Sequence, residues 1–116
     1  MKYSIIGAGT FGTAMAVIAS RCGNDVLLWA HDLKVAEGIE RDRVNPEYLN
    51  SIHLDDRIRA THSLEEAGQF GDLIFMVVPS HYYRQVLSRM EPFVGTGVSV
   101  ISGTKGIENE TLDLMS

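Results

Sequence analysis

Cysteine is nearly absent from this sequence, since Cys22 is the only one among 116 residues. A single cysteine cannot build a disulfide framework or a thiolate metal cluster within one chain. We therefore expect Cys22 to be a small buried apolar residue near the end of the first helix. No set of histidine or acidic residues shows metal-ligand spacing either, so the sequence predicts no metal site.

Long apolar runs and surplus positive charge are missing as well. No apolar stretch approaches the ~20 residues that a membrane-spanning helix needs, so we expect no membrane insertion. Residues 1–4 run directly into the first predicted strand and leave no room for a signal peptide, so we expect a cytoplasmic protein. The formal net charge of −5, from 10 basic and 15 acidic residues, argues against nucleic acid as a main partner.

Glycine, by contrast, is present in a recognisable pattern. Gly7, Gly9 and Gly12 form the motif GAGTFG, which follows an apolar strand-like run and precedes an alanine-rich stretch. This order predicts a strand, a tight turn and the first turn of a helix. A pyrophosphate must approach such a backbone closely, and side chains at Gly7 or Gly9 would block it. Because the helix N-terminus adds free N–H groups and partial positive charge, we interpret the motif as a dinucleotide site rather than a structural turn.

Strand-like and helix-like segments alternate along the rest of the chain. This alternation predicts an α/β protein, with a doubly wound parallel sheet of the Rossmann type and helices on both faces. The length suits one dinucleotide-binding domain over residues 1–116. The expected strands are 2–6, 26–30, 57–61, 72–78 and 97–102, and the expected helices begin near 11, 33, 64, 81 and 110.

Several details of these helices also follow from the sequence. Polar residues at their starts predict N-terminal caps, and an apolar face on the fourth helix predicts burial in the core rather than contact with a cofactor. Residues 43–56 have neither helical nor strand periodicity and read as a long loop. The predicted caps are Asp32, Ser63, Ser80 and Asn109, and the apolar face consists of Tyr82, Tyr83, Val86, Leu87 and Met90.

Ligands of such sheets bind beyond the carboxyl ends of the strands, where the strand order reverses. Asp32 is placed either to bind the ribose 2′-hydroxyl of NAD or to cap a helix, and His31 either to meet a 2′-phosphate or to be simply exposed. Lys105, between strand end and glycine, is either a contact for an anionic substrate or a solvated loop lysine. His81 is a weaker candidate at the same edge.

The sequence resembles the N-terminal part of bacterial-type NAD(P)-dependent glycerol-3-phosphate dehydrogenase. The resemblance covers essentially the whole chain and depends on five segments in the right order. This sequence departs from the family at Asn50 and Asp55, where members usually have proline. The matching segments are 7–14, 28–32, 45–49, 78–81 and 104–108.

The resemblance implies an oxidoreductase that reduces dihydroxyacetone phosphate to sn-glycerol 3-phosphate with NADPH or NADH, supplying phospholipid synthesis. It implies that Lys105 contacts both the cofactor and the substrate. Because His31 matches the position that contacts the adenosine phosphate in the family, the resemblance favours NADPH as the cofactor and leaves Asp32 as a helix cap. Family members continue into a helical domain that supplies the general-base lysine, so we expect a fragment with no catalytic residue of its own, and a homodimer when full length. The implied cofactor contacts are Gly7, Gly9, Thr10, Phe11, Gly12, His31 and Lys105.

Two other functions share these features. A ketopantoate reductase or a hydroxyacid dehydrogenase would use the same kind of cofactor domain, but would not be expected to carry segments 29–32 and 104–108 together. A non-catalytic dinucleotide sensor would bind the cofactor without turnover even in the full-length protein.

Overall fold

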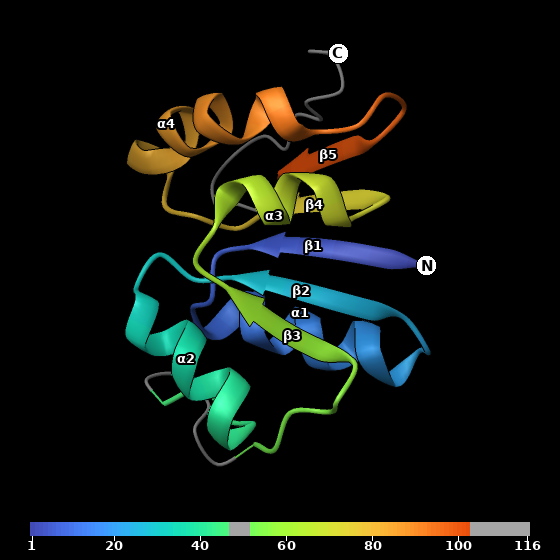
Figure 1. Ribbon diagram of the computed structural model, residues 1–116, viewed down its shortest axis with the longest axis vertical. Coiled ribbons are helices and arrows are strands. Elements are labelled where there is room, and N and C mark those ends of the chain that lie inside the picture. The colour runs from blue at the N-terminus through green and yellow to red at the C-terminus, as the bar shows by residue number, and fades with distance from the viewer. Residues whose placement is uncertain (47–51, 103–116) are drawn as a thin grey trace.

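A five-stranded sheet, in which every neighbouring pair of strands is parallel, forms the centre of the molecule (Figure 1). The computed structural model describes residues 1–46 and 52–102. The strand order is β3-β2-β1-β4-β5, so the chain builds outward from β1 on one side and then returns to build on the other. The strands are β1 (Lys2–Ile6), β2 (Asp25–Trp29), β3 (Ile58–Thr61), β4 (Leu73–Met76) and β5 (Ser99–Ser102).

Helices connect the strands and cover both faces of the sheet, which confirms the predicted doubly wound α/β fold. Ile5 lies in the core beneath α1 and α2, whereas its neighbour Ile6 lies in the core beneath α3 and α4. Both are fully buried, and burying one such side chain stabilises the fold by about 1.5–3 kcal/mol. The helices are α1 (Thr10–Arg21), α2 (Leu33–Asp42), α3 (Leu64–Phe70) and α4 (Ser80–Met90), followed by the 3-10 turn η1 (Glu91–Phe93).

Two of the predicted helix caps are confirmed. The side chain of Asp32 accepts a hydrogen bond from the backbone N–H of Lys34 at 2.9 Å, at the start of α2. The side chain of Ser63 accepts one from the N–H of Glu66 at 3.2 Å, at the start of α3. Each bond satisfies one of the N–H groups that a helix N-terminus leaves unpaired.

Two other expectations are wrong. Helix α4 begins at Ser80 itself, and Pro79, whose ψ of 145° is not helical, takes the N-cap position instead. Cys22 is exposed and caps the C-terminus of α1, because the buried positions of that helix end at Ser20. Asn109 and the helix expected near residue 110 lie outside the described residues.

The part of the chain that the structure describes contains no helix both long and apolar enough to cross a membrane. Within the same residues, histidine, cysteine and acidic side chains nowhere gather in a group of three or more that could hold a metal ion.

Candidate functional site

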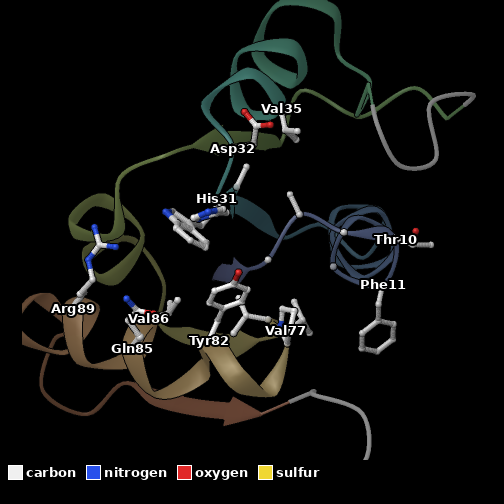
Figure 2. Close-up of a pocket in the computed structure, with 18 residues that line it drawn as sticks. Thr10, Phe11, His31, Asp32, Val35, Val77, Tyr82, Gln85, Val86 and Arg89 are labelled. Carbon is white, nitrogen blue, oxygen red and sulfur yellow. The ribbon is translucent and has the colours of Figure 1, made fainter.

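A cavity of about 1030 Å³ opens at the carboxyl ends of β1, β2 and β4 (Figure 2). The strand order reverses at this place, since β2 and β4 flank β1 and pair Ile6 with Trp29 and with Met76. Three segments line the cavity: the glycine turn before α1, the chain from the end of β2 into α2, and the chain from β4 into α4. The volume is at the upper end of ordinary ligand sites and suits a large ligand.

The three glycines of the turn have different roles. Gly7 has a φ of +130°, and a Cβ there would lie 2.6 Å from the carbonyl oxygen of Val77. A Cβ at Gly12 would overlap the carbonyl oxygen of Gly7. Both glycines are therefore required by the packing of protein backbone around the turn. For Gly7 this differs from the prediction made from the sequence, in which a side chain there would block the ligand.

Gly9 is the position where a side chain would meet the ligand. It lines the cavity, and a Cβ there would have no atom of residues 1–46 or 52–102 within 4 Å. Its φ of −82° is ordinary, so glycine is not needed for the backbone conformation. The absence of a side chain at Gly9 instead keeps space open at the N-terminus of α1.

The N-terminus of α1 has the properties of an anion site. No side chain of the described residues caps it, and its first turn contains no acidic residue. Its N–H groups and the partial positive charge of the helix therefore remain for a ligand such as a pyrophosphate. Thr10 and Phe11 follow at this end, and both are exposed and line the cavity.

The side chain of Asn45 stabilises the glycine turn through hydrogen bonds. Its Nδ2 donates to the carbonyl oxygen of Ala8 and to Oγ1 of Thr13, both at 2.9 Å, and Asn45 and Thr13 are fully buried. These hydrogen bonds link the segment after α2 to the turn, across 37 residues of sequence. The sequence placed Asn45 in a family-like segment but assigned it no function, since the partner of a polar loop residue cannot be read from its neighbours.

The end of β2 supplies aromatic and acidic groups. Trp29 is only 4% exposed, and its Nε1–H donates to the carbonyl oxygen of His62 at 3.0 Å. The ring of His31 lies 6.0 Å from that of Trp29 and 6.2 Å from that of Tyr82, measured between centroids. Asp32 caps α2 and also lines the cavity, so the two uses considered for it are compatible in space.

Helix α4 contributes a wall that the sequence did not predict. Tyr82 is 46% exposed and lines the cavity, so the expectation that it lies in the core is wrong, although Val86 and Met90 are buried as predicted. Gln85 and Arg89 also line the cavity, three and seven residues beyond Tyr82 and therefore on the same helix face. His81 does not line the cavity, and its ring lies 4.3 Å from that of Tyr82.

The structure thus brings six of the seven predicted site residues together. Lys105 is the seventh and lies outside the described residues, so its contacts remain a prediction. The six residues that line the cavity are Gly7, Gly9, Thr10, Phe11, Gly12 and His31.

Comparison with known proteins agrees with this geometry. A model of the family described as NAD-dependent glycerol-3-phosphate dehydrogenase N-terminus matches residues 2–116. Glycerol-3-phosphate dehydrogenase [NAD(P)+] of Nitratidesulfovibrio vulgaris is 42% identical over 112 residues, which are 97% of this chain and 34% of that protein. The Acinetobacter baumannii protein of the same name is 40% identical over 116 residues, which are 100% of this chain and 32% of that protein.

Solved structures of related enzymes match the fold of this chain. The crystal structure of glycerol-3-phosphate dehydrogenase from Coxiella burnetii matches with a TM-score of 0.85 and 30% identity, over 91% of this chain and 33% of that one. A ketopantoate reductase from Ralstonia eutropha matches with a TM-score of 0.78 and 28% identity, over 94% of this chain and 36% of that one. The chain therefore spans about a third of the length of these relatives. By its sequence over nearly its whole length, the chain belongs to the family of NAD-dependent glycerol-3-phosphate dehydrogenase N-terminal domains.

Proposed function

We propose that this chain is the cofactor-binding part of an enzyme that interconverts dihydroxyacetone phosphate and sn-glycerol 3-phosphate with NADPH or NADH. The observation that carries the proposal is the open space at Gly9, next to the uncapped N-terminus of α1 and at the point where the strand order reverses. Dinucleotides bind at this place in doubly wound sheets. Family membership supports the substrate, because the relatives are glycerol-3-phosphate dehydrogenases by name.

The residues of the cavity fit the cofactor in both shape and charge. The backbone from Gly9 to Gly12 would hold the pyrophosphate, whose negative charge suits the start of α1. His31 and Asp32, at the end of β2, would face the adenosine ribose. The chain between β4 and α4, including Val77, would lie along the cofactor on the other side of β1.

The chemistry is divided between the cofactor and two parts of the protein. The nicotinamide ring, when bound, supplies or accepts the hydride. The described residues would hold the cofactor, and no lysine lines the cavity among them. We propose that Lys105 contacts both cofactor and substrate, and that a lysine outside this sequence acts as general base. This chain alone should therefore bind the cofactor and turn over little or no substrate.

Fluorescence of Trp29 tests the proposal directly. It is the sequence's one tryptophan, and it lies in the wall of the cavity. Titration of the chain with NADPH or NADH should change its emission, because the bound cofactor would alter the surroundings of the indole. No change at millimolar concentration, in a sample that circular dichroism shows to be folded, would contradict the proposal.

A longer protein that includes this chain allows the substrate to be tested. We expect reduction of dihydroxyacetone phosphate, and no comparable activity on ketopantoate or 2-keto acids. Cofactor binding without turnover of any of these compounds would instead indicate a dinucleotide sensor. Changing Lys105 to alanine should raise KM and lower kcat, and kinetics equal to wild type would remove Lys105 from the site.

We also propose that the full-length protein is a cytoplasmic homodimer with a small phosphorylated molecule as its substrate. The names of the relatives support a small-molecule substrate, and the anionic character of the chain makes nucleic acid an unsuitable partner. Analytical ultracentrifugation of the full-length protein would test the dimer, and fractionation of cells would test the location.

A further inference from the structure

Arg89 is a positively charged side chain in the wall of the cavity that no structural interaction explains. It extends from α4, it is exposed, and it forms no hydrogen bond or ion pair with the described residues. No other arginine or lysine lines the cavity among the described residues. Figure 2 shows the Gln85 and Arg89 side chains extending from α4, in that order along the helix beyond Tyr82.

The carboxylate of Asp32, which lines the same cavity, would affect the binding of NADH and of NADPH differently. A carboxylate at the end of the second strand suits the ribose 2′-hydroxyl of NADH. The same carboxylate would repel the 2′-phosphate of NADPH. A site that accepts NADPH beside Asp32 therefore needs a positive charge to offset this repulsion.

The aromatic residues indicate where the adenosine would lie. The rings of His31 and Tyr82 are nearly parallel, at 25°, with centroids 6.2 Å apart. Exposed aromatic faces of this kind stack on nucleobases. Arg89 lies seven residues beyond Tyr82 on the same face of α4, so this helix presents both side chains to the cavity that His31 and Asp32 also line.

We propose that Arg89 binds the 2′-phosphate of NADPH and thereby allows this site to accept NADPH as well as NADH. The guanidinium carries a permanent charge and can donate two parallel hydrogen bonds to a phosphate. Gln85, one helical turn before it, is placed to donate a further hydrogen bond to the ribose or its phosphate. The inference rests on the proposed function, since it assumes that a dinucleotide occupies the cavity.

Two small nucleotides isolate the contribution of the 2′-phosphate. Adenosine 2′,5′-bisphosphate carries this phosphate and adenosine 5′-monophosphate lacks it, and their affinities for the chain can be measured by isothermal titration calorimetry. We expect the wild-type chain to bind the bisphosphate at least tenfold more tightly. Changing Arg89 to glutamine should remove most of this difference, while the affinity for the monophosphate stays within about twofold.

Arg84 provides a matched control, because it is an exposed arginine on the same helix that does not line the cavity. Arg84→Gln makes the same change in net charge and should leave the preference for the bisphosphate unchanged. The inference is overturned if Arg89→Gln keeps the preference, or if Arg84→Gln reduces it equally, which would indicate a general charge effect. If the folded wild-type chain binds neither these nucleotides nor NADPH, the proposed function itself fails, and the inference fails with it.

Discussion

Gly7, Gly9 and Gly12 illustrate how residues of one motif can be required for different reasons. Gly7 leaves room for the backbone of Val77, and Gly12 leaves room for the carbonyl oxygen of Gly7. At Gly9, by contrast, the described part of the chain leaves the space around a Cβ empty, so this glycine leaves room for a ligand. Substitutions at these positions should therefore separate folding from cofactor binding.

Changing Gly9 to valine should abolish cofactor binding and preserve the fold. The backbone at Gly9 has an ordinary φ, and the new side chain would meet no protein atom near its Cβ, so the cost in stability is small. The valine would occupy the space proposed for the pyrophosphate. We expect the affinity for NADPH to fall at least tenfold, equivalent to about 1.4 kcal/mol, in a fluorescence titration.

Gly95→Ala is a suitable control for this variant. A Cβ at Gly95 would make only an ordinary 3.6 Å contact with Val98, and Gly95 does not line the cavity. Its affinity for NADPH should equal that of wild type. Unchanged affinity in Gly9→Val would refute the assignment of the pyrophosphate to this turn.

Changing Gly12 to alanine should have the opposite effect and impair folding. The added methyl group would overlap the carbonyl oxygen of Gly7, so α1 could not keep its close approach to β1. Overpacking against a rigid backbone should lower the free energy of unfolding by about 3 kcal/mol or more. Urea unfolding followed by circular dichroism would measure the loss, and a midpoint equal to that of wild type would contradict it.

At the scale of elements, one carboxylate joins α2 to the exposed edge of the sheet. Strand β3 is an edge strand, and the N–H of Ala60 donates to Glu40 at 2.7 Å. The guanidinium of Arg59 donates to the same carboxylate from Nε at 3.0 Å and from Nη2 at 2.7 Å. The hydrogen bonds from Arg59 hold the pKa of Glu40 below its ordinary value of 4.5, against the opposing effect of partial burial.

Changing Glu40 to glutamine should therefore destabilise the fold in a pH-dependent way. The lowered pKa means that the folded state favours the ionised carboxylate, so its contribution is complete above the unfolded pKa and is lost as the pH falls through the folded pKa. Since Glu40 is only partly buried, we expect a loss of about 1 kcal/mol at pH 7. Thermal unfolding at pH 7 and near pH 3 would measure it.

Glu37 is the matched control, an exposed acid on the same helix that makes no hydrogen bond among the described residues. Glu37→Gln should change stability by only a few tenths of a kcal/mol at either pH. A difference between Glu40→Gln and wild type that stayed constant down to pH 3 would show that the ion pair is not its cause.

At the scale of the whole molecule, cofactor binding and folding should be linked. The cavity wall combines residues from the glycine turn, β2 and α4, so it exists only in the folded chain. A ligand at 100 times its Kd then stabilises the folded state by about 2.7 kcal/mol. For a domain of this size, we expect NADPH to raise the Tm by about 10 °C.

Differential scanning fluorimetry of the wild-type chain and of Gly9→Val would check this link. The variant should show a similar Tm without NADPH and no increase when NADPH is added. An equal increase in both proteins would place the cofactor away from the glycine turn.

Local patterns in the sequence were sufficient for the fold class and for the glycine turn that lines the cavity. Alternating strands and helices predicted the doubly wound sheet, and the spacing of Gly7, Gly9 and Gly12 predicted the turn at its edge. The caps Asp32 and Ser63 were also predictable, because a cap bonds to the N–H two or three residues further on. Each of these features depends on residues within one turn or one strand of each other.

Other features depended on contacts between distant segments, and the tertiary structure alone decided them. Periodicity placed Tyr82 and Val86 on one apolar face, and both line the cavity, but only the tertiary structure shows that Tyr82 is 46% exposed there whereas Val86 is buried. Asn45 bonds to Ala8 across 37 residues, and Arg89 gains significance only through the cavity that it shares with Asp32. The glycine turn could be read from the sequence because its geometry is a property of adjacent residues. The wall opposite it could not, because the pairing of β1 with both β2 and β4 determines which side chains meet there.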